Sequence, residues 1–198
     1  MSGRGKPATR GGGHLRIVAG RLRGSRIEVV DAAGLRPTGD RVRETLFNWL
    51  APVVAGARCL DLYAGTGALA IEAWSRGAGE CTFVERDRDL AKRLEGNLAR
   101  LGVEPARVVT GDALAFLAGA ATPFDVVFLD PPFAAGAWEQ AASRLEAGGW
   151  LREGAWIYVE SPAASTPGVP VSWREHRVGT AGNVRFALYR RAAPDPLS

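Results

Sequence analysis

Four consecutive residues have the side chains best suited to chemistry: Asp130, Pro131, Pro132 and Phe133, which follow the apolar run 124–129. The Asp130 carboxylate and the Pro131 carbonyl offer two hydrogen-bond acceptors, and Phe133 offers a ring on which a base can stack. Acceptors for both hydrogens of a nucleobase amine localise its lone pair, so that the nitrogen can attack an electrophilic carbon. We interpret the four residues as a site for the amine of a purine or cytosine base, the alternative being a strand-ending proline turn.

A second candidate site is the short loop formed by Ala64, Gly65, Thr66 and Gly67, between an apolar run and a helical segment. Glycines let the backbone approach a ligand closely, and a helix N-terminus favours an anionic group. Glu85 follows Gly65 by 20 residues, the spacing at which an acid accepts hydrogen bonds from ribose hydroxyls. The pattern predicts an adenosine cofactor, and either NAD or another adenosine compound satisfies it.

Two further acids end predicted strands. Asp61 lies four residues before Gly65, where it can orient the glycine loop or reach a cofactor amine, because an unpaired buried acid is costly. Asp112, in the segment TGDA, can accept from an adenine amino group, cap the helix that follows, or do both.

The elements that must position these residues alternate along the chain. Five apolar, β-rich runs are separated by helical segments, which predicts an α/β fold with a mostly parallel sheet covered on both faces; the runs are 57–64, 80–87, 106–113, 124–132 and 155–161. Two later runs, 173–179 and 183–191, have no helix between them and predict an antiparallel hairpin at the end of the sheet.

Four parts of the chain follow from this pattern: a disordered basic arm over 1–13, an N-terminal module over 14–54, the main domain over 55–191 and a tail over 192–198. In the module, 15–20 and 25–30 predict a β-hairpin with arginines at its tip, and 40–52 predict a helix. The segment 161–170 predicts a flexible loop.

Composition narrows the class of protein. The chain has 198 residues and a net charge of +4, but residues 1–43 alone carry ten Arg or Lys against three acids, a balance of +7, which leaves −3 for the rest. A basic end of this kind predicts contact with a polyanion such as nucleic acid, with Arg21, Arg23 and Arg26 of the hairpin as candidates.

The start lacks the apolar core of a signal peptide, so we expect a cytoplasmic protein. Neither the two histidines nor the two cysteines, expected to be buried free thiols, form a metal-binding pattern, so no metal is expected.

The motifs DLYAGTGAL, FVERD, TGDA and FLDPPF resemble those of Rossmann-like methyltransferases that use S-adenosylmethionine. Together with LRIVAGRLRG, LRPTGDRVRETLFNWL and IYVE they resemble the RsmD family over about residues 15–190. The resemblance implies a seven-stranded sheet with an antiparallel last strand. It implies cofactor binding by Asp61, Tyr63, the loop 64–67, Glu85, Arg86, Asp112 and Ala113, a target guanine held by 130–133, and Arg36, Thr38 and Arg41 at the cofactor or RNA.

We therefore expect a monomeric methyltransferase that modifies the 2-amino group of a guanine in ribosomal RNA or the small ribosomal subunit, away from membranes. An adenine or cytosine amine methyltransferase acting on RNA or DNA remains the alternative, since the motif DPPF does not name the base. A NAD-dependent oxidoreductase leaves that motif unexplained. The intact set of motifs argues against a non-catalytic RNA-binding protein.

Overall fold

Seven strands form the main sheet, in the order β5-β4-β3-β6-β7-β9-β8. The computed structural model describes residues 13–29, 39–132 and 137–192. The strands are β3 (Arg58–Asp61), β4 (Glu80–Glu85), β5 (Ala106–Thr110), β6 (Phe124–Leu129), β7 (Leu151–Pro162), β8 (Trp173–Ala181) and β9 (Val184–Arg191). The first five in the order are mutually parallel, and β9 runs antiparallel to both of its neighbours. The predicted parallel sheet with an antiparallel last strand is confirmed.

The order of the strands determines where a ligand can bind. The chain passes from β3 outward to β4 and β5, then returns to form β6 on the other side of β3. In open α/β sheets of this kind, ligands bind at the carboxyl ends of the strands where the order reverses. The carboxyl ends of β3, β6 and β7 are therefore the place to examine.

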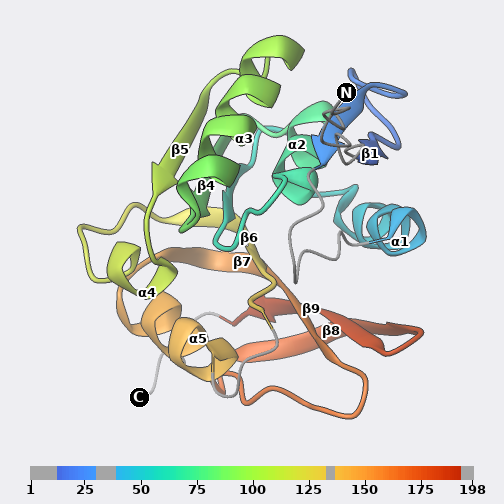
Figure 1. Ribbon diagram of the computed structural model, residues 1–198. Helices are drawn as coiled ribbons and strands as arrows, with labels where there is room; N and C mark the ends of the chain where they lie inside the picture. The colour runs from blue at the N-terminus through green and yellow to red at the C-terminus, as the bar shows by residue number, and fades with distance from the viewer. Residues whose placement is uncertain (1–12, 30–38, 133–136, 193–198) are drawn as a thin grey trace, which may run out of the picture.

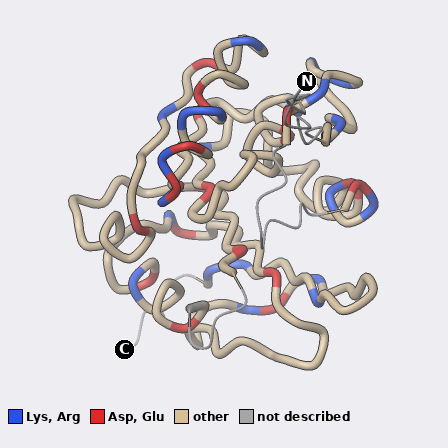
Figure 2. The backbone as a smooth tube through the Cα atoms, viewed as in Figure 1, with Lys and Arg blue, Asp and Glu red and all other residues tan. Residues whose placement is uncertain are grey.

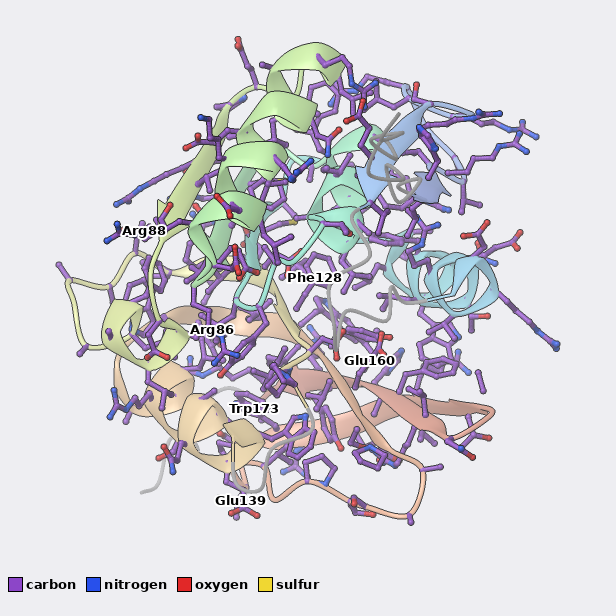
Figure 3. The ribbon with its side chains drawn as sticks, in the orientation of Figure 1. Arg86, Arg88, Phe128, Glu139, Glu160 and Trp173 are labelled. Carbon is purple, nitrogen blue, oxygen red and sulfur yellow. The ribbon has the colours of Figure 1, made fainter. Side chains whose placement is uncertain are left out.

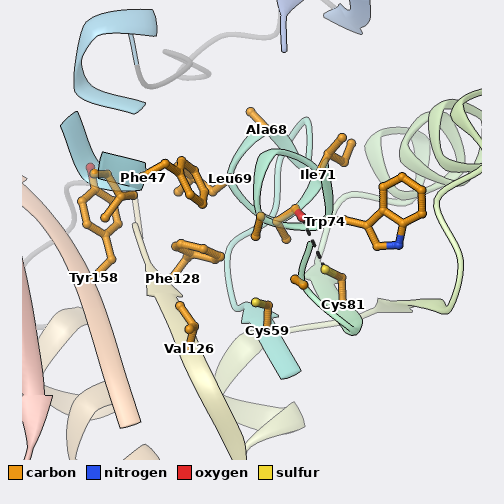
Figure 4. Close-up of a cluster of buried hydrophobic side chains, with 14 of the residues drawn as sticks. Phe47, Cys59, Ala68, Leu69, Ile71, Trp74, Cys81, Val126, Phe128 and Tyr158 are labelled. Atoms are coloured by element: carbon orange, nitrogen blue, oxygen red, sulfur yellow. Dashed lines mark hydrogen bonds between the residues drawn. The ribbon is translucent and has the colours of Figure 1, made fainter. Parts of the chain in front are cut away.

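Helices cover both faces of the sheet (Figure 1). On one face lie α1 (Asp40–Leu50), α2 (Ala68–Ser75) and α3 (Arg88–Leu101), and on the other α4 (Ala113–Phe116) and α5 (Ala137–Ala147). Each face has its own apolar cluster. In the first, the Phe47 ring of α1 lies 6.0 Å from the Phe128 ring of β6, and Cys59 and Cys81 are buried free thiols, as predicted (Figure 4).

The predicted hairpin is present as β1 (Gly13–Arg16) and β2 (Arg26–Val29), and it packs on the carboxyl end of α2. Gly20 makes this close approach possible: its φ is 82°, and a Cβ there would lie 2.0 Å from the Ser75 carbonyl oxygen. The apolar residues of β1, β2 and α1 belong to the same cluster as those of α2 and α3. The module thus shares the core of the main domain.

A buried ion-pair network fastens the hairpin and α1 to α2. Glu72 of α2 is fully buried, and its two carboxylate oxygens accept the backbone N–H groups of Val18 and Ala19 at 2.8 and 3.0 Å. Arg76 donates to it at 2.9 Å, and the buried Arg43 of α1 lies 3.5 Å from it. Arg43 also donates to Asp40 and to the Arg16 carbonyl. Removing Glu72 leaves Arg43 paired with Asp40, and removing Arg43 leaves Glu72 paired with Arg76; breaking the buried pair in either way is destabilising.

Three sequence predictions need correction or fall outside the described residues. Gly13 is part of β1, so strand pairing begins one residue before the predicted boundary. Ser161 and Pro162 are part of β7, because they pair with Arg185 and Val184 of β9. The rest of the predicted arm and most of the predicted tail lie outside the described residues. Within the described part, no helix is long and apolar enough to cross a membrane.

Candidate active site

Three acids lie at the carboxyl ends of neighbouring strands. Asp61 ends β3, Asp130 directly follows β6, and Glu160 is near the end of β7. In the sheet register Asp61 is opposite Phe128, and Phe128 is opposite Tyr158. Because side chains alternate along a strand, Asp130 and Glu160 lie one step further on the same face as these residues. That face is the one covered by α1 and α2.

The glycine loop runs from β3 into α2 and is held by Glu85. One carboxylate oxygen of Glu85 accepts the Gly65 N–H and the other accepts the Asp87 N–H, both at 2.8 Å. Gly67 caps α2 with a φ of 76°, and a Cβ there would lie 2.5 Å from a methyl group of Leu94. The positive φ favours glycine at this position, and any other side chain would also displace the Leu94 side chain of α3.

Asp61 lies under the first turn of α2. It is 3 % exposed, and its carboxylate accepts the Ala70 N–H at 3.4 Å, in a helix whose Gly67 cap has no side chain to do so. Its pKa is raised from 3.8 to about 7: burial raises it most, the Ala70 N–H lowers it, and the negative charge of Glu85 raises it. A cationic ligand group would stabilise the ionised form of Asp61.

Asp130 is partly exposed, Pro131 is buried and Pro132 is exposed. Desolvation raises the pKa of Asp130 well above its ordinary value, and the charges of Glu160 and Asp61 raise it further. Phe133, the predicted stacking ring, lies outside the described residues. The arrangement gives a carboxylate that attracts either a proton or a hydrogen-bond donor.

Glu160 is held on several sides. The Tyr158 hydroxyl donates to its Oε1 at 2.7 Å, and the Trp138 indole N–H donates to its backbone carbonyl at 2.6 Å. Glu160, which is labelled in Figure 3, is 5 % exposed. Burial and the nearby charge of Glu160 raise the pKa of Tyr158, so its hydroxyl stays protonated and keeps donating.

The other predicted cofactor residues follow the carboxyl ends of β3, β4 and β5. Asp112 is the N-cap of α4, where one oxygen accepts the Leu114 and Ala115 N–H groups at 2.9 and 3.0 Å. The capping role proposed from the sequence is confirmed, and the exposed side chain keeps further acceptor positions. Tyr63 is half-buried, and burial followed by the charge of Asp112 raises its pKa. Ala113 is buried, and Arg86 is exposed beside Glu85.

The predicted RNA-binding arginines differ in their surroundings. Arg23 and Arg26 are exposed on the hairpin and Arg41 on α1. Figure 2 shows Lys and Arg positions, coloured blue along the backbone, on both of these elements. Arg21 donates to the Trp74 carbonyl at 2.9 Å and stacks 3.9 Å from the centre of its ring, so it helps to fasten the hairpin. Arg36 and Thr38 lie outside the described residues.

Sequence reasoning assigned no role to Glu160, Glu72 or Arg43. Glu160 had the same signal as Asp61 and Asp130, an acid at the end of a buried strand, in the run IYVE. Glu72 was visible as a lone acid in the apolar helix ALAIEAWS. Over residues 13–29, 39–132 and 137–192, no group of three or more His, Cys, Asp or Glu side chains is placed to hold a metal ion.

Two hollows of the described surface are at the opposite edge of the sheet, away from these acids. One is lined by Val53, Asp125 and Trp156, and another by Arg174, His176 and Arg190, near the amino end of β7. Asp125 is ion-paired with Arg152 at 3.1 Å. The buried acids and the glycine loop thus single out the carboxyl edge as the candidate active site.

The strand order, the antiparallel β9 and the glycine loop before α2 define a Rossmann-like methyltransferase fold. A family model described as conserved hypothetical protein 95 matches residues 15–190. The chain therefore belongs to this family, the RsmD family.

Similar proteins agree with this assignment. Ribosomal RNA small subunit methyltransferase D from Escherichia coli strain K12 is 50 % identical over 189 residues, which are 95 % of this chain and 96 % of that protein. The protein of the same name from Haemophilus influenzae is 44 % identical over 182 residues, 90 % of this chain and 94 % of its own. The solved structure of yhhF from Escherichia coli superposes with a TM-score of 0.86 at 50 % identity, over 92 % of this chain and 100 % of that one.

Proposed function

We propose that this protein transfers a methyl group from S-adenosylmethionine to the 2-amino group of a guanine in small-subunit ribosomal RNA. The observation that carries the proposal is the position of Asp130, a carboxylate with a raised pKa at the carboxyl end of β6, beside the glycine loop. The names of the two relatives, which act on small-subunit ribosomal RNA, support the substrate class.

The residues present fit the proposed cofactor. Asp61 and Glu85 are buried acids on either side of the glycine loop, and Asp61 has a pKa near 7 that a cationic group would lower. Bound S-adenosylmethionine supplies an electrophilic methyl group on a positively charged sulfur, together with an ammonium group. Asp61 would hold the ammonium group, and Glu85 would accept from the ribose hydroxyls while it keeps the loop in place.

Asp130 has two tasks in the proposed reaction. Its carboxylate and the Pro131 carbonyl accept hydrogen bonds from the amine, which holds the nitrogen with its lone pair directed at the methyl group. The amine must lose one proton for each methyl group that it gains. Asp130 is a suitable acceptor for that proton, because burial and the neighbouring acids raise its pKa.

The guanine must leave its stack to reach Asp130, since the acid lies at the sheet edge beneath the helices of one face. Arg23, Arg26 and Arg41 are exposed on the module that packs over this face, and we assign them to the phosphates of the RNA. The arginines would then position the RNA without reading its sequence.

The test is transfer of tritiated methyl groups from S-adenosylmethionine to small-subunit RNA and partly assembled small subunits, followed by nucleoside analysis. We expect N2-methylguanosine. Methyladenosine or methylcytidine would instead support the alternative base assignments. Tight binding of NAD by the protein, without methyl transfer, would overturn the proposal in favour of an oxidoreductase.

A further inference from the structure

We infer that Glu160 is the residue that selects guanine, by accepting the N1–H of the target base while Asp130 accepts from its 2-amino group. Tyr158 is the positioning residue that holds the Glu160 carboxylate for this contact. The inference deepens the proposed function and rests on it, since it names how the site distinguishes one base from another.

The geometry puts two acceptors side by side. Leu129 of β6 is opposite Val159 of β7 in a parallel pair, so that the next residues, Asp130 and Glu160, continue adjacent strands at the same edge. They follow Phe128 and Tyr158, which point to the α1 side of the sheet in Figure 4 with ring centres 6.4 Å apart. The charge of Glu160 reaches Asp130 strongly enough to raise its pKa. A planar base with two adjacent donors would bridge this pair of acids.

Among the bases with an exocyclic amine, guanine alone has that pattern. Its 2-amino group is next to N1–H, a second donor, whereas the ring nitrogen next to the amine of adenine or cytosine is an acceptor. A carboxylate beside Asp130 would accept the N1–H of guanine and would repel the lone pair on the corresponding ring nitrogen of adenine or cytosine. The motif DPPF does not specify which base is bound, and Glu160 would make the site specific for guanine.

The bond from Tyr158 makes Glu160 suitable for this reading. A carboxylate has about four acceptor positions, of which the Tyr158 hydroxyl occupies one, at 2.7 Å on Oε1. The same bond, together with that from Trp138 to the Glu160 carbonyl, limits the rotation of the side chain and the strand end. A preorganised acceptor of this kind rejects a partner that lacks the donor.

The experiment compares two substrates with the same target amine. After the methylated position is mapped with the wild-type protein, small-subunit RNA is prepared with guanine or with 2-aminopurine there. 2-Aminopurine keeps the 2-amino group but has an unprotonated N1. Single-turnover methylation at saturating S-adenosylmethionine gives the guanine to 2-aminopurine rate ratio for the wild type, Glu160→Gln, Tyr158→Phe and Glu153→Gln. Glu153 is exposed at the other end of β7 and is the matched control.

We expect the wild type and Glu153→Gln to prefer guanine by at least about a hundredfold. In Glu160→Gln the amide can also donate to N1, so 2-aminopurine should react faster than in the wild type and the ratio should fall to within about tenfold. Tyr158→Phe should lower the ratio by about three- to tenfold while cofactor affinity, measured by calorimetry, is kept.

Two results would overturn the inference alone: a wild type that methylates both bases equally, or an unchanged ratio in both Glu160→Gln and Tyr158→Phe. Should Glu160→Gln fail to fold, the wild-type and Tyr158→Phe ratios decide. A wild type that methylates neither the guanine nor 2-aminopurine would overturn the proposed function itself, and the inference with it.

Discussion

Asp61 should make the ligand-free protein less stable as the pH rises. The acid is 3 % exposed and its native pKa is about 7, against 3.8 as its ordinary value. Below about pH 4 it is protonated in both the native and the unfolded state, and its full contribution to stability is present. Between these two values the unfolded chain releases the proton and the native state retains it, so the free energy of unfolding falls until the pH exceeds the native pKa.

The size of the effect follows from the shift. The pKa rises by roughly three units at about 1.4 kcal/mol each, so about 4 kcal/mol is lost between about pH 4 and pH 8. Asp61→Asn keeps an acceptor oxygen for the Ala70 N–H and has no charge to bury. The stability of this variant relative to the wild type should therefore grow from near zero at about pH 4 to about 4 kcal/mol at about pH 8.

Urea unfolding of the two proteins without cofactor, at several pH values, measures this difference directly. Titrating groups that do not interact with Asp61 are common to both proteins and cancel, whereas Asp130, whose pKa the charge of Asp61 raises, contributes to the difference. Asp89→Asn, which changes an exposed acid in the first turn of α3, is the control and should show no comparable growth with pH. A constant difference between Asp61→Asn and wild type across the range would refute the reasoning about Asp61.

Three further predictions concern the cofactor loop, the arginines and the buried network. Glu85→Ala should weaken S-adenosylmethionine binding by about 1–3 kcal/mol in calorimetry, because the ribose acceptor and the Gly65 contact are both lost; unchanged affinity would exclude Glu85 as the ribose ligand. Replacing Arg23 and Arg26 by Gln should reduce the log–log salt slope of RNA binding by somewhat under one unit per lost phosphate contact, and an identical slope in this double variant would contradict the assignment. Arg21→Ala, which loses its stacking on Trp74, should also lower the free energy of unfolding. Glu72→Gln should cost up to about 3–5 kcal/mol in urea unfolding, since it leaves the buried Arg43 with the exposed Asp40 as its remaining ion-pair partner. A loss under about 1 kcal/mol would argue against the network.

The sheet was predictable because its signals are local. Near-continuous apolar runs alternate with amphipathic helices, and each run ends in a recognisable turn, so β3 to β7 and the final hairpin follow from the sequence alone. Asp61 and Glu85 were predicted for the same reason, since each is adjacent to a glycine loop or a strand end. The end of β7 was predicted less well: SPAAS has turn-like composition, yet pairing with β9 extends the strand to Pro162.

The residues that the sequence did not predict depend on contacts between segments that are distant in the chain. Glu160 lies near Asp130 only because β7 pairs with β6, and no local sequence pattern predicts that pairing. Glu72 and Arg43 are 29 positions apart and meet only when α1 packs on α2. Arg21, predicted to contact RNA, also stacks on Trp74 of α2, a contact that the local sequence does not indicate. Long-range packing therefore decides which charged residues are available to a ligand.

The central claim is that Asp130 activates the amine of the target base, and single-turnover methylation of small-subunit RNA by Asp130→Ala and Asp130→Asn tests it most directly. An interaction made mainly in the transition state changes turnover more than binding, so calorimetry should show S-adenosylmethionine affinity largely preserved in both variants. We predict almost no methyl transfer by Asp130→Ala. Asp130→Asn should be more active than that but at least roughly a hundredfold slower than the wild type, because a preorganised charge is worth about 2.7–4 kcal/mol. Near-normal turnover by Asp130→Ala would contradict the claim and leave the motif DPPF as a structural turn.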